Sequence, residues 1–150
     1  MAGGTRIEIR PARDAAELAA ALALRHEVFC VEQGVSVADE VDGRDREALQ
    51  LVAVREGDGA LVGTCRLLFD GDTAKLGRMA VPAAARGAGI GAALLAAAEL
   101  AARRAGAARV ALHAQLAARS LYLRAGYAER GAPFVEAGIG HVAMERRLDA

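Results

Sequence analysis

The sequence has no tryptophan, two tyrosines, three phenylalanines and a single lysine, Lys75, among its 19 basic residues. Its two cysteines, Cys30 and Cys65, are too few for a disulfide framework and form no Cys-x-x-Cys pair, so we expect no metal site. The longest uncharged run, at 87–98, is too short to span a bilayer, and the N-terminal segment lacks the apolar stretch of a signal peptide. Nineteen acidic residues cancel the basic ones, which argues against nucleic-acid and membrane partners. We therefore expect a single domain over residues 1–150 that is located in the cytoplasm.

Short apolar segments alternate with turn residues along the chain and give the order of the expected elements. Two turns containing Asp-Gly, at 57–59 and 70–72, join three strand-like segments as an antiparallel meander. Asp14 followed by Glu17 is a capping pair at a helix start. The expected elements are a strand at 6–10, a helix at 14–29, a loop or short helix at 32–46, strands at 49–54, 60–69 and 73–81, a helix at 89–104, a strand at 109–114, a short helix at 117–125, and strands from 127 and at 140–148. This order predicts an α+β domain around one mixed, mostly antiparallel sheet flanked by helices.

Residues 86–92, Arg-Gly-Ala-Gly-Ile-Gly-Ala, lie between a strand end and a helix start and have the character of an anion site. The first N–H groups of a helix have no intrahelical acceptor, and glycines let the backbone bend closely around a ligand. Arg86 adds a guanidinium fork suited to phosphate oxygens. A P-loop is excluded because no Gly-Lys-Ser/Thr follows. On the residues alone, a dinucleotide-binding turn and a helix start with small residues for packing stay open, although the former expects a parallel βαβ context that is missing here.

The context of this turn resembles the GNAT superfamily of acetyl-CoA-dependent N-acetyltransferases. In that family a Gln/Arg-x-x-Gly-x-Gly/Ala turn binds the pyrophosphate of coenzyme A, and Arg86, Gly89 and Gly91 match it. The resemblance runs in order along nearly the whole chain and is similar in detail to the ElaA-like branch. The segments that carry it are Leu-Arg-His-Glu-Val-Phe-Cys-Val-Glu-Gln at 24–33, Asp-Gly-Arg-Asp at 42–45, Gly-Arg-Met-Ala-Val at 77–81, Ala-Gln at 114–115 and Glu-Ala-Gly-Ile-Gly-His at 136–141.

The resemblance implies the acyl-CoA N-acyltransferase fold, acetyl-CoA as co-substrate and an amine as acceptor. It places the pantetheine arm along the strand that precedes the turn, where backbone groups would pair with it in the manner of a β-strand. The cofactor-binding residues that it implies are Met79, Ala80, Val81, Arg86, Gly87, Ala88, Gly89, Ile90, Gly91, Ala92 and Gln115.

Acetyl transfer to an amine needs a neutral attacking nitrogen and a proton for the departing thiolate. The resemblance assigns the proton donor to Tyr122, since a phenol keeps its proton at neutral pH and can pass it to a thiolate. An alternative is that Tyr122 only packs in the core, because it also lies on an apolar helix stripe. The candidates for the base are His141 and Glu136, followed by Glu32 and Glu40, with water relayed to a backbone carbonyl as a further option.

Three other features have two interpretations each. Arg25, beside apolar helix positions, either pairs with an acid such as Glu32 or Asp42 or contacts the substrate together with Glu32 and Glu40. The acidic run at 32–42 suits a cationic acceptor or is a solvated loop. A binding module, such as an acyl-CoA sensor without turnover, is the alternative to an enzyme.

Two further expectations concern individual side chains. His113, at a strand end, is expected to be structural, and neither cysteine has an adjacent base that would favour an acyl-cysteine intermediate. Val142, Met144 and Leu148 alternate along the last strand and are expected to contribute to a homodimer interface.

Overall fold

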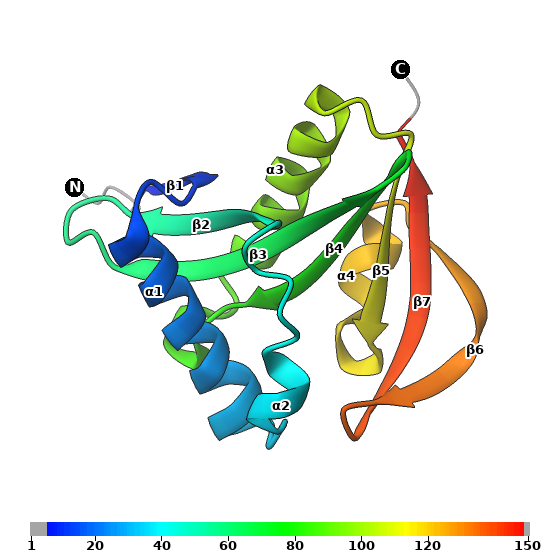
Figure 1. Ribbon diagram of the computed structural model, residues 1–150, viewed down its shortest axis with the longest axis horizontal. Helices are drawn as coiled ribbons and strands as arrows, with labels where there is room; N and C mark the ends of the chain where they lie inside the picture. The colour runs from blue at the N-terminus through cyan, green and yellow to red at the C-terminus, as the bar shows by residue number, and fades with distance from the viewer. Residues whose placement is uncertain (1–5, 149–150) are drawn as a thin grey trace.

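The computed structural model describes residues 6–148, which form a single seven-stranded sheet with helices on both faces (Figure 1). The strand order is β1-β2-β3-β4-β5-β7-β6, and every neighbouring pair is antiparallel except β4 and β5. The strands are β1 (Ile7–Pro11), β2 (Leu49–Arg55), β3 (Leu61–Asp70), β4 (Thr73–Ala80), β5 (Arg109–Gln115), β6 (Ala128–Glu136) and β7 (Ile139–Arg147). The predicted α+β class and mixed sheet are therefore confirmed.

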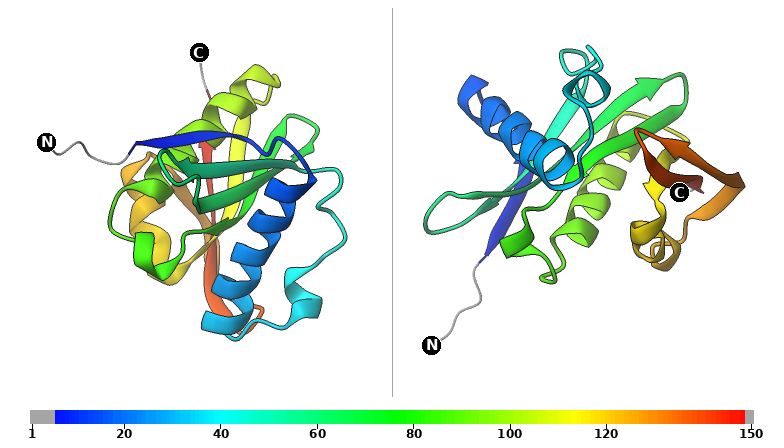
Figure 2. Two further views of the ribbon diagram at one scale, coloured as in Figure 1. Left: turned by 90° about the vertical axis from the view of Figure 1, so that its left-hand side faces the viewer. Right: turned by 90° about the horizontal axis from the view of Figure 1, so that it is seen from below.

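The helices form two layers, with α1 and α2 over one face of the sheet and α3 and α4 over the other (Figure 2). Their bounds are α1 (Ala15–Arg25), the π-helix η1 (His26–Glu32), α2 (Val37–Glu40), the 3₁₀ turns η2 (Ala83–Ala85) and η3 (Leu116–Ala118), α3 (Ile90–Arg104) and α4 (Arg119–Arg124). The predicted helix at 14–29 thus begins as expected, with the Asp14 carboxylate accepting from the Glu17 amide at 2.9 Å, but it widens into a π-helix after Arg25. No helix of residues 6–148 is long and apolar enough to cross a membrane.

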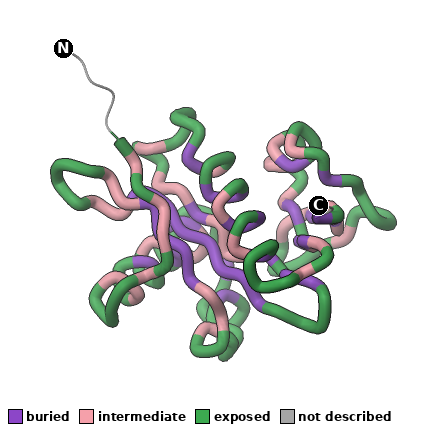
Figure 3. Tube along the Cα trace, turned by 90° about the horizontal axis from the view of Figure 1, so that it is seen from above, coloured by how far each residue is buried: buried purple, intermediate pink, exposed green. Residues whose placement is uncertain are grey.

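The main core lies between the central strands and α3, and Figure 3 shows the buried positions concentrated along those strands. Alanine-rich α3 buries an apolar stripe that includes Leu94, Leu95 and Ala98. It packs directly on the β3 backbone at Gly63, where an added Cβ would stand 2.9 Å from the Ile90 side chain. This close approach fixes the N-terminus of α3, and with it the glycine-rich turn, against the sheet.

Two irregularities in β4 open the sheet at its centre. Between Arg66 and Thr64 on β3, β4 has one extra residue, and Arg78 in this bulge adopts a left-handed φ of 53°. On its other side β4 pairs with β5 only as far as Leu76 and Leu112, so the ends of these parallel strands diverge (Figure 1). The diverging ends leave an opening that a regular sheet would have closed.

The prediction that three residues of the last strand contribute to a dimer interface is wrong. Val142, Met144 and Leu148 have relative exposures of 0%, 1% and 8% and belong to the core of this chain. The reason is topological, because β7 lies between β5 and β6 and its apolar face meets the helix layer of the same molecule. Alternation along a strand shows that one face is buried but not which chain buries it.

Candidate active site

Two grooves meet where β4 and β5 diverge. The first, of about 290 Å³, is here called the turn-side groove, and its lining includes Met79, Arg86, Gly91 and Tyr122. The second, of about 370 Å³, is the hairpin-side groove, because its lining includes residues of the β6–β7 hairpin together with α2. The residues that line both are Phe29, Arg78, His113 and Gln115. The two grooves thus adjoin each other at the opening in the sheet.

The glycine-rich turn leads into α3 and contributes Arg86 and Gly91 to the lining of the turn-side groove. Gly87 and Gly89 have left-handed φ values of 84° and 81°, which explains glycine at both positions. The first helical hydrogen bond runs from the Ala93 amide to the Gly89 carbonyl at 3.0 Å, and no side chain caps the helix. The amides of residues 90–92 therefore have no helical acceptor and suit an anion. The Ile90 side chain is buried in the core, so only its backbone is available to a ligand.

Arg86 is placed at the turn as expected, but its guanidinium has a protein partner. Two hydrogen bonds of 2.6 and 2.7 Å join it to the Glu32 carboxylate, and its Nε donates to the Val81 carbonyl at 2.9 Å. The hydrogen bond from Arg86 lowers the pKa of Glu32. Glu32 therefore lies beside the turn and lines neither groove, which corrects its expected place at the acceptor.

Tyr122 combines the two interpretations left open by its sequence position. Its ring is buried and meets Tyr127 edge to face at 5.9 Å, whereas the residue also lines the turn-side groove. The hydroxyl has one weak partner, the Met79 sulfur at 3.8 Å. Burial raises the pKa of Tyr122 to about 12. Within residues 6–148 the Tyr122 hydroxyl thus has no strong hydrogen-bond acceptor, and its raised pKa favours the protonated form at neutral pH.

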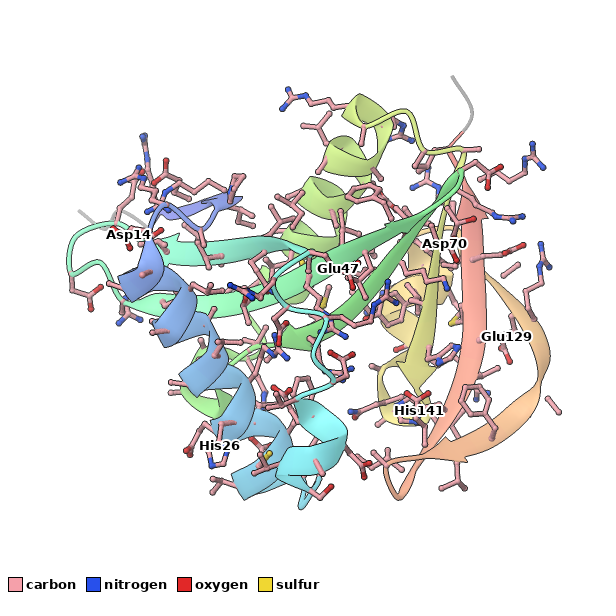
Figure 4. The ribbon with its side chains drawn as sticks, viewed as in Figure 1. Asp14, His26, Glu47, Asp70, Glu129 and His141 are labelled. Atoms are coloured by element: carbon pink, nitrogen blue, oxygen red, sulfur yellow. The ribbon has the colours of Figure 1, made fainter. Side chains whose placement is uncertain are left out.

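Three titratable side chains meet on the other side of the opening. His113 Nδ1 lies 2.9 Å from one Glu136 oxygen, and His141 Nε2 lies 3.9 Å from the other. Phe134 stacks against His141 at 6.0 Å and meets His113 edge to face at 5.0 Å. His113, expected from the sequence to be structural, has a side chain that is 54% exposed and lines both grooves. Figure 4 shows His141 near the end of β5, within this region.

A buried ion network forms the wall behind the hairpin-side groove. Arg25 is completely buried and donates to both Glu40 oxygens at 2.8 Å and to Asp45 at 2.6 Å. Its pairing with acids is confirmed, but the partners differ from the expected Glu32 and Asp42, because the last residue of α2, Glu40, and the following segment with Asp45 contact the end of α1. Arg25 is therefore removed from substrate, and Glu40 lines the groove with its carboxylate already committed to Arg25.

The same network extends to the bulge in β4. Arg66 pairs with Asp42 and with Asp45, the latter at 3.1 Å, and its hydrogen bonds help hold the pKa of Asp42 below the usual range. Arg78, the left-handed residue, donates to the carbonyls of Asp39 at 3.3 Å and Glu40 at 3.1 Å. The bulge thus directs a guanidinium onto the backbone of α2 and fixes that helix as a wall of the groove.

Comparison with known proteins shows the family to which the chain belongs. The acetyltransferase (GNAT) domain model matches residues 16–148. The chain belongs to the GNAT acetyltransferase family. YjcF of Bacillus subtilis (strain 168), an uncharacterized N-acetyltransferase, is 34% identical over 134 residues, covering 89% of this chain and 94% of the relative.

Solved GNAT structures agree over nearly the whole fold. An acyl-CoA N-acyltransferase from Pseudomonas aeruginosa has 32% identity and a TM-score of 0.80 over 95% of this chain and 99% of its own. Escherichia coli ElaA has 26% identity and the same TM-score and coverage, in agreement with the branch indicated by the sequence. At 13% identity, an aminoglycoside 6′-N-acetyltransferase complexed with coenzyme A shares the fold, with a TM-score of 0.75 over 97% of this chain and 98% of its own. The GNAT family uses acetyl-CoA or related acyl-CoA substrates.

Sequence reasoning missed two residues of this site. Arg78 lies in the matched segment 77–81, but only the bulge shows that it connects β4 to α2. His113 precedes the matched Ala-Gln pair at 114–115, and its strand position gave no sign of the opening in the sheet. The available signal for His113 was its place at the exit of a strand that runs parallel to β4.

Proposed function

We propose that this GNAT protein transfers the acetyl group of acetyl-CoA to a primary amine by direct attack. The observation that carries the proposal is the meeting of two grooves at the opening between β4 and β5. One groove is lined by Gly91 in the first turn of α3 and by Tyr122, and the other is lined by His113, Glu136 and His141. A thioester and an amine bound in the two grooves would meet without an acyl-enzyme intermediate.

The residues of the turn-side groove fit a coenzyme A ligand. The amides of residues 90–92 offer donors to its phosphates, and Arg86 adds a positive charge if it exchanges Glu32 for phosphate. The diverging ends of β4 leave the backbone of residues 79–81 unpaired toward β5, where a pantetheine arm would fit as the family resemblance implies. The thioester supplies an activated acetyl carbonyl, and the protein has to hold it, receive the amine and protonate the thiolate.

The charge of the hairpin-side groove favours a cationic acceptor. The guanidinium groups of Arg25, Arg66 and Arg78 are matched in number by the carboxylates of Glu40, Asp42 and Asp45, so the network is neutral. The remaining carboxylates in the lining are those of Asp39 and Glu136. Their negative charge suits an ammonium group at physiological pH. We therefore expect primary amines, as small molecules or on a peptide.

The alternative function is an acyl-CoA sensor that binds acetyl-CoA without turnover. Thiol release from acetyl-CoA, measured against a panel of diamines, polyamines, aminoglycosides and short peptides, separates the two functions. The proposal predicts thiol release that depends on at least one amine and matches the acetylated amine formed. Tight acetyl-CoA binding with no release for any amine would establish the sensor instead.

The cofactor groove is tested by Gly91→Asp. At this position an added Cβ would meet Leu121 and Met79 at 3.6 and 3.7 Å, which are ordinary contacts, and an acid in the first helical turn is favourable to folding. Its carboxylate would, however, face the phosphates, and we expect acetyl-CoA affinity to fall by at least about tenfold in a calorimetric titration. Ala96→Asp, which adds the same charge at an exposed position of α3, is the control and should bind normally. Unchanged affinity in Gly91→Asp would remove this turn from the cofactor site.

A further inference from the structure

We infer that His113 is the proton acceptor for the attacking amine and that Glu136 orients its ring. The inference rests on the proposed function, because it assigns the base for that same reaction. Among the three titratable side chains at the opening, His113 lines both the turn-side and the hairpin-side groove, whereas Glu136 and His141 line the hairpin-side groove and not the turn-side groove. The base has to reach the nitrogen at the moment it approaches the thioester, and that point lies between the grooves.

The hydrogen bonds of His113 leave the correct nitrogen available. A carboxylate only accepts hydrogen bonds, so the 2.9 Å contact makes His113 Nδ1 the donor to Glu136. In the neutral ring the other nitrogen, Nε2, then carries a lone pair, and within residues 6–148 no side chain or backbone group is bonded to it. This is the arrangement of a base whose tautomer is fixed by a carboxylate.

The second histidine lacks this freedom. His141 Nδ1 lies 2.7 Å from the Ile139 carbonyl and therefore donates to it, and its side chain is only 9% exposed. Its Nε2 faces the second Glu136 oxygen at 3.9 Å. Phe134 packs against both histidine rings, so His141 belongs to the packing around the pair of His113 and Glu136.

Charged and titratable side chains share groove linings with His113 on several sides. In the hairpin-side groove they are Asp39, Glu40, Asp42, Arg78, Glu136 and His141, and in the turn-side groove they are Arg78 and Arg86. A third groove, of about 310 Å³, is lined by His113 together with Arg66, Lys75, Arg78, Arg130, Glu136 and Glu145. Arg130 is paired with Glu145 at 2.9 Å, and Arg66 and Arg78 are engaged by the acids of the buried network. The carboxylate in direct contact with the ring is therefore Glu136, and it stabilises the imidazolium that forms on proton transfer.

The proposed step balances as follows. An ammonium proton passes to His113 Nε2 and then to solvent, and the freed nitrogen lone pair forms the C–N bond to the acetyl carbon. The C–S bond breaks with its electron pair on sulfur, and the Tyr122 hydroxyl proton neutralises the thiolate. The second nitrogen proton leaves to water, and a proton from water restores Tyr122. The sum converts ammonium and thioester into amide, thiol and one released proton.

The test compares His113→Gln with the wild type and with His26→Gln, using the panel amine that has the highest kcat/KM. His26 is exposed at the start of η1 and lines neither groove, and Figure 4 places it well away from His141. We expect His113→Gln to lower kcat/KM for the amine by about 10²–10⁴-fold near pH 7, with unchanged acetyl-CoA affinity. The loss should shrink as the pH rises toward the pKa of the free amine, because the nucleophile then arrives deprotonated.

A double-mutant cycle separates the orienting carboxylate from an independent base. Glu136→Gln should cost less than His113→Gln, and the double variant should lose no more than His113→Gln alone. If the losses of kcat/KM in Glu136→Gln and His113→Gln add in the double variant, Glu136 does not act by orienting His113. If His113→Gln is as active as His26→Gln, His113 is not the base. A loss that stays constant with pH would equally overturn it, because a packing role has no such dependence. If the wild type acetylates no amine at all, the proposed function itself fails, which is a different result from an active His113→Gln.

Discussion

Replacing Tyr122 by phenylalanine is expected to lower kcat by about 10²–10⁴-fold and to leave acetyl-CoA affinity unchanged. The substitution keeps the ring, its burial and its edge-to-face contact with Tyr127. It removes only a hydroxyl whose partner is the Met79 sulfur at 3.8 Å, so less than about 1 kcal/mol of stability is at risk. The lost activity should be smaller for acyl donors whose thiols have a lower pKa, since such thiolates leave without a proton.

The matched control is Tyr127→Phe. Tyr127 is buried beside Tyr122, but its hydroxyl donates to Glu99 at 2.8 Å and does not line the turn-side groove. Its loss leaves Glu99 with Arg146 and should affect stability without affecting turnover. A Tyr122→Phe protein with wild-type kcat would reject the acid role, and the thiolate would then take its proton from water.

The pH dependence of kcat in the wild type follows from the burial of Tyr122. Because burial raises the pKa of Tyr122 to about 12, the hydroxyl stays protonated far above neutral pH. The acid form should therefore persist, and kcat should show no decline from Tyr122 ionisation below about pH 11. An alkaline decline near pH 10 that disappears in Tyr122→Phe would contradict the buried environment described for this hydroxyl.

Replacing Arg25 by methionine is expected to destabilise the protein by about 3–5 kcal/mol, because it removes the cation that contacts both oxygens of the buried Glu40 and one of the two cations paired with the half-buried Asp45. As cationic partners within residues 6–148, Glu40 would keep only Arg78, at 3.7 Å, and Asp45 only Arg66, at 3.1 Å. Methionine fills much of the same volume, so the loss measures the charges rather than a cavity. Urea unfolding followed by circular dichroism gives the free energy directly. Arg55→Met, which breaks an exposed pair with Asp58, is the control and should change little.

The sign of the pH effect provides a second check on this network. Burial alone would raise the pKa of Asp45. Hydrogen bonds from Arg25 and from other side chains outweigh burial and lower that pKa in the folded state. A depressed folded pKa contributes stability above the unfolded value, near about 3.9, and that contribution is lost as the pH falls through the folded pKa. The difference between wild type and Arg25→Met should thus be largest above about pH 4 and shrink below it. A difference that is small at pH 7 would show that Arg25 does not balance the two acids.

Local patterns determined most of the fold in advance, because each depends on residues close in sequence. The two turns at 57–59 and 70–72 join β2, β3 and β4 as a meander, as predicted, and the Asp14 cap begins α1. The glycine-rich turn also lies where predicted, since the need for left-handed φ at Gly87 and Gly89 is local. The predictions that failed concern contacts between residues that are far apart in the sequence. Glu40 and Asp45 are separated from Arg25 by a segment with no regular period, and nothing in that segment marks them as its partners.

The site shows the same division. Tyr122 and the glycine-rich turn, which we propose to hold the cofactor, are recognisable from sequence because their motifs are contiguous. His113 is not, because its role depends on the end of the pairing between β4 and β5 at Leu76 and Leu112, and on Glu136, 23 residues farther along the chain. Strand alternation predicts which face a residue occupies, but not that the sheet opens beside it.

The measurement that tests direct transfer most directly is a single turnover. The protein is first saturated with acetyl-CoA, then mixed with the best amine of the panel, and free thiol and acetylated amine are quantified over time alongside the mass of the intact protein. The account predicts that thiol and acetylated amine appear together in equal amounts and that acetyl-CoA alone leaves the protein unmodified, since Cys65 is buried with its pKa raised to about 12 and Cys30 lines neither groove. Thiol released before the amine is added, with an acetyl group retained on the protein, would contradict direct attack.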